Sequence, residues 1–476
     1  MLPRYSREFL PSGFDSKPTV TRRNFLVGIV VFALVVSGAY AWRQLGRPGL
    51  IAIPPTELAP PLYTEYHEAE LHLPQHDWSK TRPGDGQRFF FVAGHVRDLG
   101  WGNALQEHLM NAYLAYRAGR IFVFDNYTWN DDGSLYSKYN GHWIPSQIPY
   151  SSLIRGPIVG EPFPDNVHAS PAVSREYFDQ VCPKKLKLAR NAVHANLVSK
   201  FSAELVTDAW VTTIREIEDP CVEESRKSGP IYVHYETWGV RLALKDIWSS
   251  FSTSPIITHF GWSSLVERAF DHNSGLIIPK TLSMPILADH PFTSNAERYS
   301  PIPGLLAIHV RRGDYEQHCP RLALNSDGFV GVTNFQDMPD QFVVLPKQGG
   351  ETTPDHFEHY RRRCFPTVGE IVEKVAEIRI SPTGTGINQL YIMTNGRPAF
   401  VQELKEALLA AGEWNMISSS RDLVLDWDQK FVSQAVDMLI AQRAQVFIGN
   451  GFSTLTSTAV MMRLANSFPM NSNRFW

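Results

Sequence analysis

The pattern of apolar and polar positions between residues 88 and 125 predicts a strand, a helix and a second strand. Residues 88–93 (RFFFVA) form a continuous apolar run typical of a buried strand, and residues 104–119 (ALQEHLMNAYLAYRAG) repeat apolar positions with the period of a helix. A glycine-bearing turn, GHVRDLGWGN, joins them, and a second apolar run, residues 120–125 (RIFVFD), follows the helix at once. This order indicates a parallel βαβ crossover.

The C-terminal part of the chain shows the same alternation over a longer stretch. Its predicted strands are residues 305–310, 389–395, 415–419 and 445–450, and its predicted helices are residues 398–411, 429–443 and 453–465. Residues 325–356 are polar and contain glycines and prolines, which predicts a long loop. Between the two regions, residues 231–235 are a further strand candidate. We therefore expect an α/β fold of two Rossmann-like domains, residues 87–300 and 301–476, that face each other across a cleft.

The N-terminal end carries a candidate membrane anchor. Residues 25–42 are 18 consecutive residues without a charge, nearly enough for a helix to span a bilayer. Basic residues outnumber acidic ones in residues 1–24, so the positive-inside rule keeps this tail in the cytosol and places the following chain in the lumen. A cleavable signal peptide is the alternative interpretation, although the tail is long for one. The proline-rich residues 43–86 are typical of a stalk that holds the catalytic part away from the membrane.

Composition and charge fit a globular luminal protein. Hydrophobic residues make up 43% of the chain, which is enough for sizeable cores. The formal net charge is −3, and nothing in its distribution indicates a nucleic-acid-binding surface. One sequon, Asn126-Tyr127-Thr128, is compatible with glycosylation in the secretory pathway.

The four cysteines, Cys182, Cys221, Cys319 and Cys364, lie in the part of the chain that this topology exposes to an oxidising compartment. Four cysteines allow three pairings. We expect Cys182 to pair with Cys221 and Cys319 with Cys364, because these pairings close the shorter loops. Four free buried thiols are the alternative.

The most informative motif, His309-Val310-Arg311-Arg312-Gly313-Asp314-Tyr315, comes directly after a predicted strand. Ligands of open α/β sheets bind outside the carboxyl ends of strands, where these side chains emerge. A guanidinium offers a fixed fork of donors to a pyrophosphate and stays charged at any relevant pH. We therefore interpret Arg311 and Arg312 as candidate ligands of a departing nucleoside diphosphate, with a solvated basic turn as the alternative.

The HVRRGDY motif resembles the first donor-binding motif of the α1,2-, α1,6- and protein O-fucosyltransferases. Residues 100–103 (GWGN), which open the first long helix, are similar to the G-x-G-N turn of these enzymes. Residues 448–456 (IGNGFSTLT) resemble their C-terminal motif, in which glycines let the backbone approach a phosphate at a helix start. The motifs occur in the family's order between about residues 88 and 465. The resemblance implies a two-domain architecture of the GT-B type and a GDP-fucose donor, without a further cofactor or a metal.

The resemblance also implies roles for individual residues. Arg311 matches the arginine that contacts the donor β-phosphate, and His309 and Asn103 match positions that line the donor cleft. Asp437, on the helix before the last strand, is placed to accept hydrogen bonds from the guanine amino groups. The remaining residues that we expect at the donor are Gly102, Arg312, Asn450, Gly451, Ser453, Thr454 and Thr456.

Fucosyltransferases of this kind invert the anomeric centre, so the acceptor hydroxyl needs a general base or strong stabilisation of the leaving group. The chain departs from its relatives here. The α1,6 branch has a lysine where this chain has Tyr315, and some protein O-fucosyltransferases have a glutamate where this chain has Trp101. Asp314 is the first candidate for the base and Glu316 the second. The acceptor, a protein or glycan hydroxyl, cannot be identified from these motifs.

Two other functions compete with this interpretation. Asp426-Trp427-Asp428 has the form of the Asp-x-Asp motif with which another glycosyltransferase architecture holds a divalent cation. A membrane protein of the same fold could also bind glycans without turnover. We expect a single-pass enzyme of the Golgi membrane, with the endoplasmic reticulum as the alternative because short spans suit thinner membranes.

Overall fold

The computed structural model describes residues 59–77, 86–195, 197–199, 202–233, 243–347 and 351–476. In these segments no helix is both long and apolar enough to cross a membrane. The cytosolic tail and the anchor expected at residues 25–42 lie outside the described residues.

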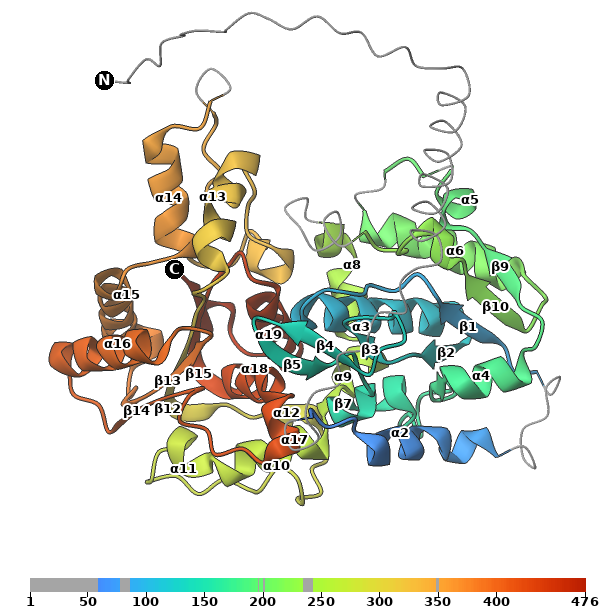
Figure 1. Cartoon of the computed structure of the whole chain (residues 1–476), viewed down its shortest axis with the longest axis horizontal. Helices are drawn as coiled ribbons and strands as arrows, with labels where there is room; N and C mark the ends of the chain where they lie inside the picture. Colours follow the sequence, from blue (N-terminus) through green and yellow to red (C-terminus); the bar gives the residue numbers. More distant parts are fainter. Residues whose placement is uncertain (1–58, 78–85, 196, 200–201, 234–242, 348–350) are drawn as a thin grey trace, which may run out of the picture. The chain divides into compact units, whose positions relative to one another are not determined.

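The first sheet contains five parallel strands in the order β8-β2-β1-β10-β9 (Figure 1). The predicted βαβ unit is confirmed, because helix α3 (Trp101–Arg117) connects β1 to the neighbouring strand β2. The strands are β1 (Phe89–Val92), β2 (Ile121–Phe124), β8 (Val173–Ser174), β9 (Leu186–Leu188) and β10 (Cys221–Glu224).

The second sheet also contains five parallel strands, in the order β14-β13-β12-β15-β16. The four strands predicted from the sequence are confirmed to within a few residues. They are β12 (Ile302–Val310), β13 (Gln389–Thr394), β14 (Met416–Ser419) and β15 (Ala444–Gly449), and the edge strand β16 (Asn473–Phe475) adds to them.

Helices cover both faces of the second sheet because side chains along a strand point alternately to its two sides. Leu306 and Ile308 of β12 belong to the cluster formed with α15 (Val368–Ile380) and α16 (Pro398–Ala411). Leu305 and Ala307 belong to the other cluster, with α18 (Ser433–Arg443) and α19 (Thr454–Ala465). That cluster also contains residues of α3, so one core joins the two halves.

Both predicted disulfides are confirmed. Cys182–Cys221 joins the residue after α4 (Arg175–Val181) to the first residue of β10. Cys319–Cys364 joins α13 (Tyr315–Asn325) to α14 (Pro354–Cys364), which lie side by side as a pair of helices.

One strand was assigned to the wrong place. Residues 231–233 form no strand, and the expected strand's last two residues lie outside the described part of the chain. The central position beside β1 is taken instead by β10, whose sequence CVEE ends in two glutamates. Gly94 N–H donates to the Glu224 carboxylate at 2.7 Å, which allows this glutamate to be buried in a strand. The prediction relied on continuous apolar runs, and β10 has none.

Part of the expected stalk is folded against the globular unit. Residues 59–77 contain helix α2 (Thr64–Leu71) and a 3₁₀ turn, η2 (Pro74–His76). Tyr63 Oη donates to the carbonyl of Asp428 at 2.7 Å, and Ser151 N–H donates to Glu70 at 2.9 Å. The prolines therefore delimit short helical elements here, and the stalk prediction is wrong for this segment.

The boundary expected at residue 300 also differs from the packing. Helices α10 (Ser264–His272) and α11 (Ser274–Ile277) contact the second half of the chain. Asn273 Nδ2 donates to the Val424 carbonyl at 2.9 Å, and Ser418 Oγ donates to the Leu276 carbonyl at 2.7 Å. Helices α10 and α11, which precede β12 in the chain, therefore pack with the second half.

A buried carboxyl group fixes the loop that follows β1. Glu107 of α3 is only 3% exposed, and its Oε2 accepts a hydrogen bond from the Val96 N–H. Burial raises the pKa of Glu107 from 4.5 to about 8, although the Val96 N–H and the nearby Arg97 oppose that rise. The loop at residues 93–100 is therefore held by a side chain that is uncharged in the native state at neutral pH.

This raised pKa predicts a specific dependence of stability on pH. Between about pH 4.5 and pH 8 the native state keeps a proton on Glu107 that the unfolded state loses, so stability falls as pH rises through this window. Replacing Glu107→Gln should remove this contribution, worth on the order of 1–3 kcal/mol. Urea unfolding at pH 5 and pH 8 measures it, with the exposed Glu403→Gln as control. If the free energy of unfolding of Glu107→Gln changed with pH in the same way as that of the unmodified chain, the raised pKa of Glu107 would be contradicted.

Candidate active site

A cleft of about 400 Å³ lies between the two halves of the chain. It is formed at the carboxyl edge of the second sheet, because Arg311 directly follows β12 and α19 begins shortly after β15. The first half contributes residues 98–103, Trp129 and Tyr139 to its lining. The second half contributes Arg311, Asp314, Tyr315, His318, Leu322, Asp327, Gly328, Val330, Gln434, Phe452, Ser453, Thr454 and Leu455.

The N-terminal ends of two long helices converge at this cleft. The first turn of α3 lies against the first turn of α19, with Thr458 Oγ1 donating to the Gly102 carbonyl at 3.3 Å. A Cβ atom at Gly102 would lie 2.6 Å from the backbone nitrogen of Leu455, so only glycine permits this approach. Neither Gly100 nor Ser453, the residues that precede the two helices, caps its helix with a side chain. The free N–H groups and positive dipole ends favour an anion there.

Arg311 is the basic side chain among the residues that line the cleft. Its guanidinium is 23% exposed, donates to Asp314 Oδ2 at 2.6 Å and lies 4.8 Å from the centre of the Tyr315 ring. The ion pair and the ring leave the guanidinium in a defined orientation beside the α19 terminus. An arginine held in this way needs little reordering to bind a diphosphate.

Two residues that line the cleft each have a buried polar atom without a partner among the described residues. They are Arg311, through its Nε donor, and Asn103, through its Oδ1 acceptor. A buried polar atom without a hydrogen bond costs about 1–3 kcal/mol. Both atoms are shielded from solvent, so the group that the cleft offers to a ligand is the exposed part of the Arg311 side chain.

The two candidate bases have different surroundings. Asp314 accepts from Arg311 and from Asn395 Nδ2, the latter at 2.9 Å, so its carboxylate orients the guanidinium. Glu316 is exposed on α13 and is not among the residues that line the cleft. Glu316 is therefore poorly placed to act as a base for a reaction in this cleft.

Several motif residues lie behind the cleft and support its wall without lining it. His309 is buried, and its Nδ1 lies 2.7 Å from Thr456 Oγ1; burial, together with Arg311, lowers the pKa of the imidazole to about 3. Thr456 Oγ1 also accepts from the Asn450 N–H at 3.1 Å. These two contacts connect β12, the glycine turn and α19. None of the three residues lines the cleft, and their contact with a donor stays a prediction.

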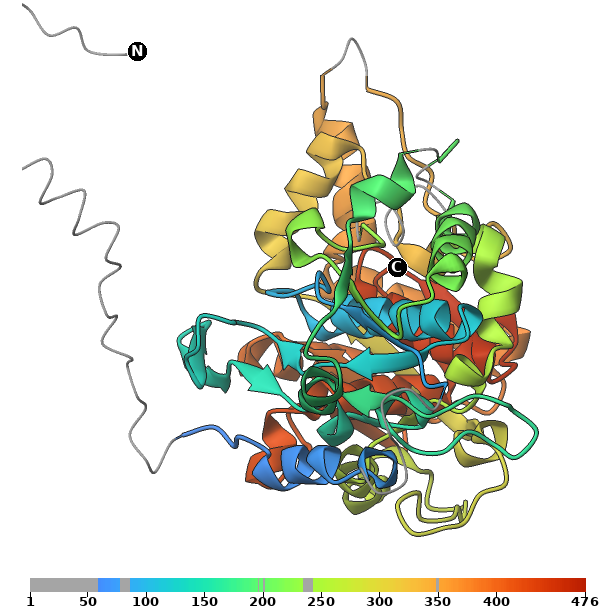
Figure 2. The same ribbon diagram turned by 90° about the vertical axis from the view of Figure 1, so that its right-hand side faces the viewer.

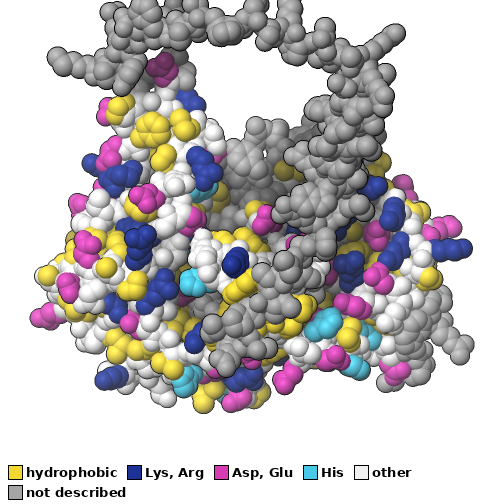
Figure 3. Space-filling model, viewed as in Figure 1, with side chains coloured by type: hydrophobic (Ala, Val, Ile, Leu, Met, Phe, Trp, Pro, Cys, Tyr) yellow, Lys and Arg dark blue, Asp and Glu magenta, His cyan; other side chains and the backbone are white. Residues whose placement is uncertain are grey.

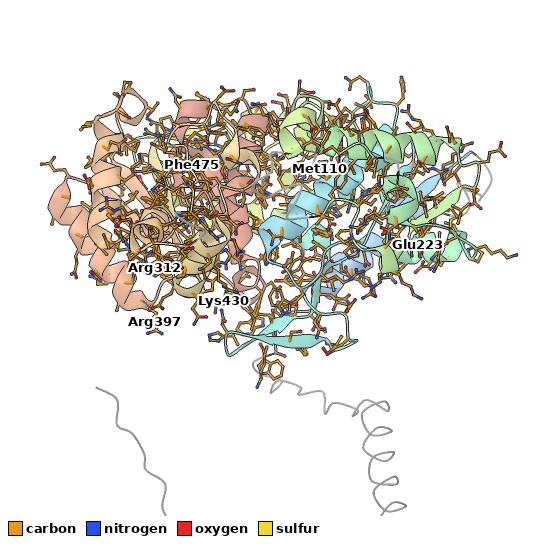
Figure 4. All side chains as sticks on the ribbon, turned by 90° about the horizontal axis from the view of Figure 1, so that it is seen from above. Met110, Glu223, Arg312, Arg397, Lys430 and Phe475 are labelled. Atoms are coloured by element: carbon orange, nitrogen blue, oxygen red, sulfur yellow. A yellow bond between two sulfur atoms is a disulfide. The ribbon has the colours of Figure 1, made fainter. Side chains whose placement is uncertain are left out.

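Arg312, Gly451 and Asp437 also lie outside the lining. Arg312 is 8% exposed and lies between the rings of Phe365 and Phe400, at 4.4 and 4.2 Å; it is labelled in Figure 4. Gly451 faces the Phe329 ring and accepts at its carbonyl from the Val330 N–H. The two oxygens of Asp437 accept from neighbouring hydroxyl groups, including Tyr391 Oη at 2.7 Å, and burial raises its pKa to about 6. All three residues therefore make contacts inside the protein and do not face the cleft.

The Asp-x-Asp triplet has a local explanation. Asp426 caps helix α17 (Trp427–Lys430), because its carboxylate accepts from the Gln429 N–H at 2.8 Å. The Asp426 N–H in turn donates to the side-chain oxygen of Gln429. Neither Asp426 nor Asp428 lines the cleft. Among the described residues, no group of three or more His, Cys, Asp or Glu side chains is arranged to hold a metal ion.

The structure adds cleft residues that the motifs did not identify. Asp98 lies in the loop before α3 with a positive φ of 57°, and Gln434 lies in the first turn of α18. Trp129 and Tyr139 come from the insertion between β2 and β8, which has no pattern of its own in the sequence. Of these, only Asp98 could have been suspected from the sequence, because it is an acidic residue next to the G-x-G-N turn.

The chain was compared with known families, sequences and structures. No family profile and no curated protein matches it. POFUT1 in complex with GDP is 14% identical, with 79% of this chain and 94% of that chain covered and a TM-score of 0.44. POFUT1 in complex with GDP-fucose is 15% identical, with 80% and 95% covered and a TM-score of 0.40. NodZ alpha-1,6-fucosyltransferase soaked with GDP-fucose is 12% identical, with 79% and 92% covered and a TM-score of 0.36. These TM-scores lie below 0.5 and carry no argument about function.

The contact between α3 and α19 predicts an asymmetric response to two substitutions. Gly102→Ala would place a methyl group 2.6 Å from backbone atoms of α19, and we expect it to lower the free energy of unfolding by about 1–3 kcal/mol. Gly100→Ala, two residues earlier, meets no heavy atom within 4 Å and should change stability by less than about 0.5 kcal/mol. Urea denaturation of both variants tests the contact. Equal effects would show that the two helix ends are not in close contact in solution.

Proposed function

We propose that the chain is a metal-independent, inverting glycosyltransferase that transfers fucose from GDP-fucose. The diphosphate of the donor binds between Arg311 and the N-terminal ends of α3 and α19. The observation that carries this proposal is Arg311, an oriented and partly exposed arginine, beside two helix ends that no side chain caps. A diphosphate can accept hydrogen bonds from the guanidinium and from the free N–H groups of the helix ends. The resemblance of the HVRRGDY motif specifies guanine and fucose.

The chemistry follows from where negative charge develops. An oxygen of the acceptor hydroxyl bonds to the anomeric carbon while the bond from that carbon to the β-phosphate oxygen breaks. The electron pair of that bond stays on the departing GDP, and the hydroxyl proton passes to its β-phosphate. Fixed positive groups at that position stabilise the transition state more than the ground state. Arg311, oriented by Asp314, and the two helix ends supply this stabilisation.

The proposed setting is the lumen of the secretory pathway, with the chain as a type II protein of the Golgi membrane. The two disulfides support an oxidising compartment, and Asn126 lies in a sequon. The apolar residues 25–42 support membrane attachment. The acceptor in this proposal is a hydroxyl of a protein or a glycan.

The proposal predicts that Arg311 is needed for turnover. Arg311→Ala should lower kcat by about 10²–10³, because a positive group that acts in the transition state is lost. Arg311→Lys should recover only part of this, since an ammonium lacks the fork of donors. The measurement is GDP release from GDP-fucose by the full chain, together with the shift in Tm that GDP causes.

Arg397→Ala is the matched control, because Arg397 is an exposed arginine of the same half that does not line the cleft; it is labelled in Figure 4. This variant should release GDP at the rate of the unmodified chain. A chain that binds GDP but never releases it from GDP-fucose would be a non-catalytic binder. A chain whose Tm does not respond to GDP would contradict the donor site itself.

A further inference from the structure

The wall of the cleft opposite Arg311 is aromatic. Trp101 opens α3, while Trp129 and Tyr139 belong to the insertion between β2 and β8. Tyr139 ends β4 (Tyr136–Tyr139), which pairs with β5 (His142–Pro145) around Asn140 and Gly141, both with positive φ. This hairpin projects from the first half of the chain, as the quarter-turned views show (Figure 2, Figure 4).

Two of these aromatic side chains form a corner. The rings of Trp129 and Tyr139 have centroids 4.9 Å apart and planes inclined by 73°. Tyr139 is 41% exposed and Trp129 is half-buried. Large aromatic side chains are usually buried on folding, so a corner of this kind at the mouth of a cleft leaves apolar area for a ligand.

An acidic residue of the loop before α3 lines the cleft next to this corner. The Asp98 N–H donates to the Thr128 carbonyl at 3.2 Å, and Tyr127 Oη donates to the Leu99 carbonyl at 2.9 Å. These two bonds tie the loop to β3 (Tyr127–Thr128), the strand that leads directly into Trp129. The backbones of Asp98 and Trp129 are thus held together before any ligand binds, which lowers the entropy cost of binding.

An aromatic face next to a carboxylate matches the surface of a pyranose ring. Such a ring has a face of C–H groups with partial positive charge and a rim of hydroxyl groups. The C–H face suits the electron-rich face of an aromatic ring, and neighbouring hydroxyls can donate to a carboxylate. An extended peptide would instead need a free strand edge or apolar pockets at alternate positions. Asp98 is the charged side chain among the lining residues of this wall, which favours a neutral sugar over an acidic one.

We propose that Trp129, Tyr139 and Asp98 form an acceptor subsite for a neutral pyranose, so that the acceptor is a glycan and not an unmodified polypeptide. This proposal rests on the proposed function, because the same cleft holds the donor at Arg311. It adds a separate requirement, since the subsite lies on the first half of the chain and the arginine on the second.

The test compares donor and acceptor binding in the full chain. Tryptophan fluorescence is followed during titration, with saturating GDP, of neutral oligosaccharides ending in galactose, glucose or N-acetylglucosamine, of their sialylated forms, and of unglycosylated serine/threonine peptides. We expect at least one neutral oligosaccharide to bind and its sialylated form to bind more weakly. Tyr139→Ala and Trp129→Ala should each raise the Kd of that oligosaccharide about tenfold. Trp129→Phe should have a smaller effect, because an aromatic face remains.

Trp143→Ala is the matched control. Trp143 lies in β5 of the same hairpin, where it stacks with Lys138 at 4.9 Å, and does not line the cleft. Its oligosaccharide affinity should stay unchanged. All variants should keep the Tm shift caused by GDP, which separates a damaged subsite from a damaged fold. If GDP binds and peptides bind but no oligosaccharide does, or if neither Tyr139→Ala nor Trp129→Ala weakens oligosaccharide binding, the glycan subsite is refuted. If GDP itself does not bind, the donor site fails instead.

Discussion

The close approach of α3 and α19 at Gly102 is the constraint on which the rest of the site depends. Each helix belongs to a different half of the chain, and each begins directly after the turn that follows a central parallel strand. Because a Cβ at Gly102 would collide with the α19 backbone, the two positive helix ends converge only with glycine at this position. The shared core holds the contact in place. The cleft, and the position of Asn103 across from Arg311, depend on this junction.

Much of the fold could be predicted because its parallel strands are buried on both faces. The apolar runs at β12, β13 and β15 admit few other interpretations, and α16 was predicted at its observed bounds, Pro398–Ala411. The strand β10 could not be found, since its buried Glu224 is satisfied by a backbone N–H from a distant loop. The same limit applies to α2: its contacts with Asp428 and Ser151 are tertiary, and a short proline-flanked segment gives no local sign of them.

The sequence motifs contain residues that meet at one cleft, but they did not predict which of these residues line it. Arg311, Asn103 and the start of α19 line the cleft, whereas His309, Asn450 and Thr456 bond to one another behind it. Sequence spacing cannot separate these groups, because both follow directly from strands at the same sheet edge. The separation depends on which way each side chain points. Arg312 illustrates this: one residue beyond Arg311, it points to the opposite side and stacks between two phenylalanine rings.

The proposed donor and acceptor sites are built on different kinds of structure. The proposed donor site uses strand ends and helix ends of the parallel sheets, whose positions the whole core determines. The aromatic corner belongs to the insertion between β2 and β8, which is attached to the scaffold through β3. Acidic and basic side chains are interspersed over the face of the molecule shown in Figure 3. A hairpin of this kind can change its side chains without disturbing the parallel sheets, because few core residues come from it. Acceptor specificity can therefore vary independently of donor chemistry in this architecture.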